Sequence, residues 1–412
     1  MYSIVKLKED ELKNAVKTFS NAYPGVPVSL EQYEERILAI NKYSFVNFYG
    51  VYDEDNLIGG MRLHDFNMNL LQQKITAGGV GSVAVDLLRK KEKVAKEMIK
   101  FFLYHFREKG ASMALLYPFN PEFYKKMGFG FGTSMNQFKI CPKNLPKGYS
   151  KKNIKLLTVD DAEAMCIFYN KMVDKTNGLI EKCTNEFKGL FRDPSNKVFG
   201  YKVNGEILGY MVLQFRKGDV ESFLINDIFI SEILFHNSEV FLELMTFLNS
   251  QSDQFRYIII NTQDENFRFA LKDPRNNSSR LLISVYHECS AQGTGIMYRV
   301  INVKKLFQDL KEHNFNNISC KLKLKINDTF MEENNDSYII QFIDGKATCV
   351  DEGEYDVELS IDIADFSSLI TCVVDLKSLY RYGLVKLSKD EYLNKLNTIF
   401  ASDEKPRCLT SF

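Results

Sequence analysis

Hydrophobic residues recur along the chain at two spacings, and the change from one spacing to the other predicts strands and helices in a regular order. Small and β-branched residues over 79–85 predict a strand, and apolar residues over 94–109 recur at helical spacing. The apolar run Met113–Leu116 is short enough to be a buried parallel strand. A basic loop at 86–93 joins the first strand to the helix. The stretch therefore predicts a strand–loop–helix–strand unit.

The flanking segments extend this unit into a mixed sheet with two helices ahead of it. Strands are expected at 5–7, 48–52, 57–63 and 74–85, and helices at 9–23 and 30–41. Ser29 is expected to cap the second helix, with Gln32 as its capping-box partner. Residues 128–140 are expected to supply the last strand, before a linker rich in proline and lysine. The first domain is therefore predicted to span residues 1–150.

A second stretch repeats the first at a constant offset of 150 residues. Residues 50–63 and 200–213 both have the pattern of a strand–turn–strand hairpin, with two glycines, a methionine and the closing leucine in common. Further elements are expected as strands at 154–157, 226–230 and 257–260 and as helices beginning at 160 and spanning 239–248. A second domain of the same kind is therefore predicted over 151–291. Its loop at 231–239 has two acids and no basic residue, so a phosphate group would be repelled there.

The remainder of the chain, 292–412, predicts a third domain of strands followed by helices. Strands are expected at 318–326, 337–343, 346–350 and 355–361, and helices at 363–373, 376–382 and 388–399. The dipeptide Asp344-Gly345 is typical of a hairpin turn between the second and third of these strands.

Composition limits the classes of function. Lys+Arg and Asp+Glu both number 53 in 412 residues, so the net charge is zero, which argues against a protein wrapped on nucleic acid. No apolar run has the length of a signal peptide or a membrane span, so a cytoplasmic protein is expected. The eight cysteines lack Cys-x-x-Cys spacing and the five histidines form no metal motif, which favours reduced thiols and no metal site.

The basic loop before the helix is a candidate anion site. Backbone N–H groups and the helix dipole favour an anion at a helix N-terminus. Arg89, Lys90, Lys91 and Lys93 add positive charge there. The alternative is a solvated basic helix start, which the spacing alone slightly favours. Both interpretations stay open on the residues of the loop.

Residues 79–132 as a whole resemble the acetyl-CoA-binding core of the GNAT N-acetyltransferases. The phosphate loop of that core, Gln/Arg-x-x-Gly-x-Gly/Ala, aligns with residues 90–95, where Lys93 stands in place of the middle glycine. Its Phe-Tyr-x-x-x-Gly-Phe segment matches residues 123–129 without departure. The three domains in this order resemble the Eis (enhanced intracellular survival) acetyltransferases. The resemblance implies an α+β protein with tandem GNAT folds, each a mixed central sheet flanked by helices, followed by a sterol-carrier-protein-like α/β domain.

The resemblance also implies the chemistry. It implies an acetyl-CoA-dependent N-acetyltransferase that acts on a primary amine of an aminoglycoside, a polyamine or a lysine side chain, and that forms a homo-oligomer, in Eis a hexamer. Tyr124 is implied as the general acid and the terminal carboxylate of Phe412 as the general base. A phenol suits protonation of a thiolate, and a chain end rich in apolar residues can bury its last ring and carry the carboxylate inward. No metal is implied.

The coenzyme contacts are carried over by the same resemblance. The backbone of Val83, Ala84 and Val85 is expected to meet the pantetheine; the pyrophosphate contacts are Lys90, Lys91, Glu92, Lys93, Val94, Ala95 and Lys96; and Phe119 and Asn120 precede the catalytic tyrosine. Candidate walls of the acceptor pocket are Tyr23, Val26, Tyr33 and Phe45, each of which could equally be an ordinary core aromatic or aliphatic residue. The alternative from a different class is a non-catalytic ligand- or lipid-binding protein whose coenzyme loop is disabled by Lys93.

Overall fold

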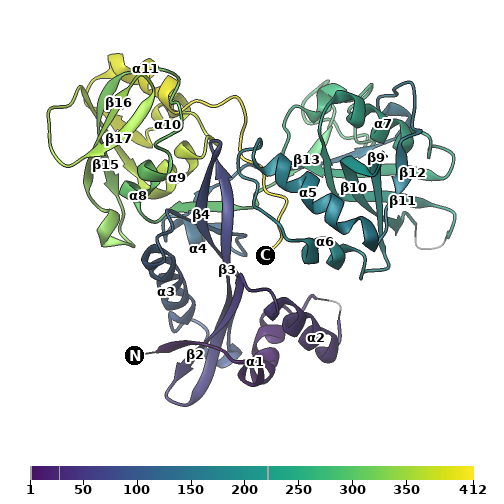
Figure 1. Cartoon of the computed structure of the whole chain (residues 1–412), viewed down its shortest axis with the longest axis horizontal. Coiled ribbons are helices and arrows are strands. Elements are labelled where there is room, and N and C mark those ends of the chain that lie inside the picture. Colours follow the sequence, from purple (N-terminus) through teal and green to yellow (C-terminus); the bar gives the residue numbers. More distant parts are fainter. Residues whose placement is uncertain (1, 27, 220–221) are drawn as a thin grey trace. The chain divides into compact units, whose positions relative to one another are not determined.

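A computed structural model describes residues 2–26, 28–219 and 222–412 (Figure 1). The chain forms two compact units, each built from more than one stretch of sequence. The first unit comprises Met1–Gly132, Thr176–Ile180 and Gly295–Phe412, and the second comprises Thr133–Lys175 and Glu181–Thr294. Over these described ranges, no helix is both long and apolar enough to cross a membrane. The expected α+β class is confirmed, with three sheets and helices packed against them.

The first sheet has seven strands in the order β1-β2-β3-β4-β5-β14-β6. Their bounds are β1 Ser3–Lys6, β2 Val46–Asp53, β3 Asn56–Leu70, β4 Gln73–Val85, β5 Met113–Leu116, β14 Met297–Val300 and β6 Gly130–Phe131. The helices of this region are α1 Glu9–Ala22, α2 Leu30–Asn41, α3 Val94–Glu108 and α4 Pro121–Lys125. Strands β4 and β5 pair in parallel, with α3 as their crossover. The predicted strand–loop–helix–strand unit is therefore confirmed.

Local chemistry accounts for these elements. Helix α3 buries one face against the sheet, including Val94, Met98 and Phe102, as the helical spacing predicted. At α2 the Ser29 hydroxyl accepts a hydrogen bond from the backbone N–H of Gln32 (3.2 Å), and the Gln32 side chain accepts one from the N–H of Ser29 (3.1 Å). The expected capping box is confirmed.

The prediction of one last strand over 128–140 is wrong. Only the two residues of β6 join the first sheet, through β14, which pairs with β5 on its other side. Strand β7 (Met135–Ile140) instead pairs with β12 (Phe255–Thr262) in the second sheet. The alternation of apolar residues marks both segments as strands but carries no information about which open edge each one covers. The domain limits at 150 and 292 stay predictions.

The second sheet, in the second unit, has the order β13-β7-β12-β11-β10-β9-β8. Its other strands are β13 Ser290–Gly293, β11 Asn226–Phe235, β10 Glu206–Lys217, β9 Asn196–Val203 and β8 Ile154–Leu156, and its helices are α5 Ala162–Val173, α6 Thr184–Leu190 and α7 Ser238–Asn249. Strands β11 and β12 pair in parallel around α7, as β4 and β5 do around α3. Residues 231–235 were expected in a loop, but they continue β11, where the partly buried Glu232 side chain forms an ion pair with Lys182 (3.1 Å).

The third sheet has the order β17-β16-β15-β18-β19 and belongs to the first unit. Its strands are β15 Cys320–Asn327, β16 Ser337–Ile343, β17 Lys346–Val350, β18 Val357–Asp362 and β19 Val385–Leu387. The accompanying helices are α8 Val303–Asp309, α9 Ile363–Ile370, α10 Leu376–Arg381 and α11 Leu393–Ile399. The bounds of β16 and β17 match the predicted strands at 337–343 and 346–350.

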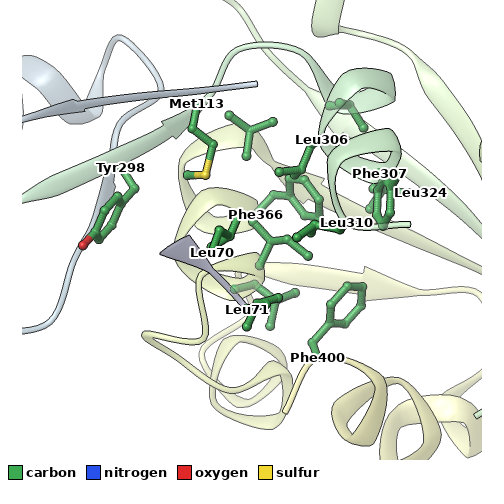
Figure 2. Packing of buried hydrophobic residues seen from close by; sticks show 14 of the residues in the cluster. Leu70, Leu71, Met113, Tyr298, Leu306, Phe307, Leu310, Leu324, Phe366 and Phe400 are labelled. Carbon is green, nitrogen blue, oxygen red and sulfur yellow. The ribbon is translucent and has the colours of Figure 1, made fainter. Parts of the chain in front are cut away.

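The hairpin of β3 and β4 links the first and third sheets through a shared core. Strand β3 was expected to end near residue 63, but it runs to Leu70 and its tip enters the C-terminal domain. Figure 2 shows Leu70 and Leu71 among Phe366, Leu310 and other apolar side chains of that domain. Leu70 is fully buried there. The length of β3 therefore depends on a distant partner, which the local pattern did not reveal.

Candidate active site

A cavity opens where β4 and β5 diverge. The two strands pair only from Ala77 opposite Met113 to Val80 opposite Leu116, although β4 continues to Val85. The cavity between them has a volume of about 440 Å³, within the usual range for small-molecule sites. Its lining residues are Tyr23, Val26, Tyr33, Arg36, Ile37, Ile40, Arg62, Val80, Gly81, Ser82, Val83, Leu116, Tyr117, Pro118, Phe119, Tyr124 and Phe412.

A bulge in β4 shapes the floor of this cavity. Gly60 of β3 lies opposite Ala84 and Arg62 lies opposite Gly81, so one residue of β3 faces two residues of β4. Ser82 has a positive φ of 49° at this point. Within the described residues, β3 alone pairs with β4 beyond Val80, so the other edge of β4 has no strand partner there.

Tyr124 reaches the cavity from the short helix α4. The Asn120 side chain caps this helix by accepting a hydrogen bond from the N–H of Phe123 (3.2 Å). Tyr124 is only 5% exposed. Burial, followed by the neighbouring Tyr23, raises the pKa of Tyr124 to about 12, so its phenol is protonated at neutral pH.

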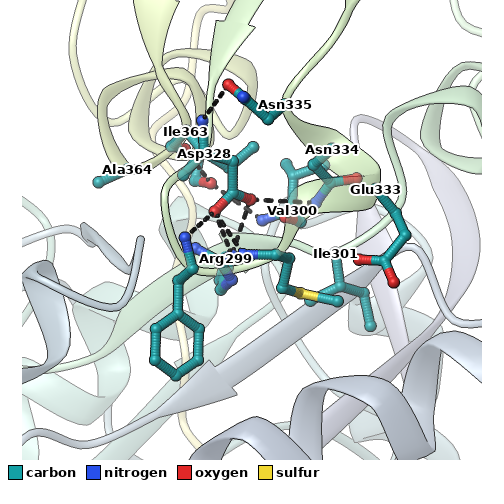
Figure 3. Close-up of polar contacts among 12 residues, drawn as sticks. Arg299, Val300, Ile301, Asp328, Glu333, Asn334, Asn335, Ile363 and Ala364 are labelled. Carbon is teal, nitrogen blue, oxygen red and sulfur yellow. Dashed lines mark hydrogen bonds and ion pairs between the residues drawn. The ribbon is translucent and has the colours of Figure 1, made fainter.

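A buried ion pair supports the segment that carries Tyr124 (Figure 3). Arg299 of β14 donates from Nη2 to both carboxylate oxygens of Asp328 (2.9 and 2.7 Å), and both side chains are fully buried. The guanidinium lies against Gly128, where a methyl group would come within 1.3 Å of its Nη1 atom. Gly128 also has a φ of +81°, which disfavours other residues. The glycine of the Phe-Tyr-x-x-x-Gly-Phe segment is therefore required by a residue 171 positions further along the chain.

Phe412 lies in the same cavity as Tyr124. Its ring packs 4.9 Å from the ring of Phe66, 5.2 Å from that of Tyr117 and 5.6 Å from that of His64, measured between centroids. Its carbonyl carbon lies directly over Gly81, where a methyl group would come within 2.7 Å of it. The expected inward course of the chain end is confirmed, and it requires glycine at position 81.

Contacts further back hold the tail in place. Gly178 approaches Pro406 and Arg407 closely, and the N–H of Arg407 donates to the carbonyl oxygen of Asn177 (2.8 Å). The hydroxyl of Tyr117 donates to the carbonyl oxygen of Thr410 (3.2 Å). These contacts lie within the first unit and position the last residue from several directions.

Two basic side chains of β3 lie beside the chain end. Burial lowers the pKa of Arg62, and Nε of this residue is buried with no hydrogen-bond partner among the described residues. Burial, followed by the charge of Arg62, holds the pKa of His64 well below its usual range, so its imidazole is neutral at pH 7. The phenol of Tyr23 donates to the carbonyl oxygen of Val83 (3.2 Å).

The basic loop leads into the N-terminus of α3. Lys93 is the N-cap residue, with φ 66° and ψ 8°, and its side chain makes no capping hydrogen bond. Arg89 is held by ion pairs with Asp53 and Glu92, which raise its pKa. Lys90, Lys91, Lys93 and Lys96 are exposed. The loop thus combines free lysine side chains with a helix N-terminus whose first N–H groups lack intrahelical acceptors.

The left-handed backbone conformation of Lys93 leads to a testable prediction. A non-glycine residue costs about 1–2 kcal/mol in this region, and glycine removes that cost while it adds chain entropy to the unfolded state. We expect Lys93→Gly to raise the free energy of unfolding by about 1 kcal/mol in urea. The control is Lys90→Gly, which removes the same charge where φ is −65° and is expected to lower that free energy. Lower stability of Lys93→Gly than of Lys90→Gly would contradict the prediction.

The cavity brings together some of the residues expected from the sequence. Tyr124, Phe412, Val83, Phe119, Tyr23, Val26 and Tyr33 line it. Phe45 does not line it and instead stacks on Tyr43 (5.3 Å). Ala84, Val85 and Val94 are buried, Ala95 is half-buried, Glu92 pairs with Arg89, and Asn120 caps α4. The catalytic and coenzyme roles of these residues stay predictions.

Sequence reasoning missed Arg62, His64 and Tyr117. The first two lie at alternate positions of β3, on the strand face that continues with Phe66 and Met68. Two basic residues on the buried face of a strand are a signal that could have been used. Tyr117 follows the end of β5, where strands of this kind carry functional residues. Among the residues with described positions, no group of three or more His, Cys, Asp or Glu side chains is placed to hold a metal ion.

Comparisons with known proteins agree with this geometry. Residues 3–132 match the acetyltransferase (GNAT) domain model, and residues 303–409 match the sterol carrier protein domain model. Comparison with curated proteins gave no match.

Solved structures are similar over the full length of both chains. A GCN5-related N-acetyltransferase from Anabaena variabilis has a TM-score of 0.83 at 16% identity, and one from Kribbella flavida has 0.78 at 16%. Eis1 from Mycobacterium abscessus has a TM-score of 0.79 at 16% identity. In each case the match covers 100% of both chains, and at these identities the likeness establishes the fold. We conclude that the chain carries an acetyltransferase (GNAT) domain and a C-terminal sterol carrier protein domain, and that it shares the overall fold of Eis1.

Proposed function

We propose that the protein transfers an acetyl group from acetyl-CoA to a primary amine, with Tyr124 as general acid and the terminal carboxylate of Phe412 as general base. One observation carries the proposal: a buried phenol and the last residue of the chain line the same cavity, at the point where β4 and β5 diverge.

The reaction needs a proton removed at one end and supplied at the other. The amine nitrogen attacks the thioester carbonyl carbon, so a C–N bond forms and the C–S bond breaks. The surplus ammonium proton passes to the Phe412 carboxylate, and Tyr124 donates its proton to the leaving thiolate. The raised pKa of Tyr124 keeps this proton on the phenol until the thiolate forms.

The same geometry supports the coenzyme assignment. The unpaired edge of β4 at Val83–Val85 can take the pantetheine amides as an added strand would. The pyrophosphate would lie at the N-terminus of α3, beside Lys90, Lys91 and Lys93. Lys93 keeps the backbone conformation that glycine favours, so the loop is shaped for phosphate despite the substitution.

We further propose a homo-oligomer, with a hexamer as the first assembly to test, and amines of the aminoglycoside, polyamine or lysine type as first acceptors. Support for assembly comes from exposed apolar side chains in the second unit, including Leu282, Ile283 and Val285 at 68%, 70% and 78% exposure. Such a cluster marks an interaction surface. Sedimentation of the intact protein tests it, and a monomer at all concentrations would contradict it.

Coenzyme binding is expected to stabilise the protein against unfolding. At an acetyl-CoA concentration a hundred times the dissociation constant, the gain is about 2.7 kcal/mol. A thermal melt with and without acetyl-CoA measures it, and ATP at the same concentration controls for unspecific phosphate binding. The absence of any shift at millimolar acetyl-CoA would contradict a coenzyme site.

Turnover is the direct test of the proposed function. Release of coenzyme A thiol from acetyl-CoA is measured with a panel of primary amines, and the acetylated amine is identified by mass. We expect thiol release that requires the amine. Acetyl-CoA binding without acetylation of any amine would overturn the proposal.

A further inference from the structure

The charged side chains that line the cavity are all basic. Of the lining residues, only Arg36 and Arg62 carry charged side chains, and the carboxylate of Phe412 is the one negative group beside them. Neither arginine forms an ion pair with any described residue. One carboxylate facing two guanidinium groups leaves the cavity with a net positive charge.

The Arg62 side chain is poorly satisfied where it lies. Its Nε atom is buried and without a hydrogen-bond partner in the described part of the chain, and its Nη2 atom lies beside Gly81 on the side where Phe412 ends. A buried guanidinium that lacks full pairing is costly, and an anion that completes its hydrogen bonds offsets that cost. Arg36 is exposed, so an anion can reach its guanidinium group from solvent.

Part of the cavity wall is apolar. Ile37 and Ile40 line the cavity from α2, and Val26 lines it from the preceding loop. This wall suits a chain of methylene groups. A second ammonium group would meet two guanidinium groups and no acidic side chain.

We propose that the acceptor is a primary amine with a carboxylate at the far end of a short methylene chain, an ω-amino acid, and that Arg36 and Arg62 select it over polycationic amines. This inference rests on the proposed function and narrows its acceptors, because it disfavours the polyamines and aminoglycosides among them. The carboxylate binds the Arg36 guanidinium through charge-assisted hydrogen bonds, and the amine reaches the thioester at the other end, beside Phe412 and Arg62. The positive surroundings also disfavour the ammonium form of the amine, which eases its deprotonation.

Matched substrates test the selectivity. The values of kcat/KM are compared for 5-aminopentanoate, for pentylamine, which lacks the carboxylate, and for cadaverine, which has a second amine in its place. We expect 5-aminopentanoate to exceed pentylamine by at least about tenfold, since one charge-assisted hydrogen bond is worth that much, and cadaverine to be the poorest. Arg36→Gln is expected to bring the first ratio close to one. Arg192→Gln, which removes an exposed arginine outside the cavity, is expected to leave the ratio unchanged.

A binding measurement separates failure of the inference from failure of the proposed function. Pentanoate and pentylamine are titrated into the complex with coenzyme A, and binding is followed by NMR in intact protein and in Arg36→Gln. Cadaverine as the best acceptor, or pentanoate binding that Arg36→Gln does not weaken, would overturn the selectivity and leave acetyl transfer intact. Pentanoate binding that is lost in Arg36→Gln, without acetylation of any amine, would overturn the proposed function and support an anion site.

Discussion

Tyr124→Phe is expected to lower kcat for acetyl transfer by about 10²- to 10⁴-fold, the usual contribution of a positioned general acid. The variant keeps the buried ring and removes only the hydroxyl, so the thiolate must leave without a proton donor. Because burial raises the pKa of Tyr124 to about 12, the wild-type phenol keeps its proton throughout the neutral and mildly alkaline range. Stopped-flow or steady-state thiol release measures the loss.

The control for this variant is Tyr104→Phe. Tyr104 lies on α3 outside the cavity, where its hydroxyl donates to Glu333 and its pKa is also raised to about 12, chiefly by burial. We expect kcat of this variant to match the wild type. The pH profile gives a second check: kcat/KM of the wild type should keep rising with pH up to about 10, as the amine loses its proton, without a falling limb from Tyr124. A falling limb near pH 9 that disappears in Tyr124→Phe would contradict the pKa assigned to this acid.

Removing Phe412 is expected to lower kcat by about 10²- to 10⁴-fold as well, because the base moves out of the cavity. Deletion alone also removes the ring that packs on Phe66 and Tyr117. Two further variants separate the roles. A single glycine added after Phe412 keeps the ring and displaces the carboxylate, and Phe412→Leu keeps the carboxylate and replaces the ring.

The terminal carboxylate acts as base only if the added glycine is nearly as damaging as the deletion and Phe412→Leu retains most of the activity. If Phe412→Leu loses most of the activity and the added glycine is tolerated, Phe412 has a packing role.

Gly81→Ala tests the same contact from the side of β4, since the new methyl group would lie 2.7 Å from the carbonyl carbon of Phe412 and displace it. Gly189→Ala, at a position with open space around it, is the control and is expected to keep full activity.

Most of the local structure could be predicted from the sequence, because it is determined by local chemistry. The crossover helix α3, the cap at Ser29 and strands β16 and β17 follow from periodicity, capping residues and turns within a few positions. The segment from Phe123 to Phe129 also indicated Tyr124 correctly as a residue of the cavity. These signals need no knowledge of distant residues.

The rest depends on partners far along the chain. Nothing near Gly128 indicates that Arg299 lies against it, and nothing near residue 135 indicates that β7 leaves the first sheet. Arg62 was missed because its position in the cavity is defined by the chain end beside it, which is far away in sequence. Long-range pairing of this kind leaves no periodic trace in a single sequence.

The pairing of β14 within the first sheet, and of β7 within the second, has a consequence for synthesis of the protein. During translation, the first sheet is complete up to β5 long before β14 emerges, and β14 carries the arginine that lies against Gly128. The nascent GNAT domain therefore exposes an unpaired edge at β5, which is a hazard for aggregation, until the ribosome has passed residue 300. Phe412 reaches its place beside Gly81 later still. Tyr124 and Phe412 therefore line one cavity only after the C-terminal domain has folded around the β3–β4 hairpin, so we expect incomplete chains to lack the finished cavity.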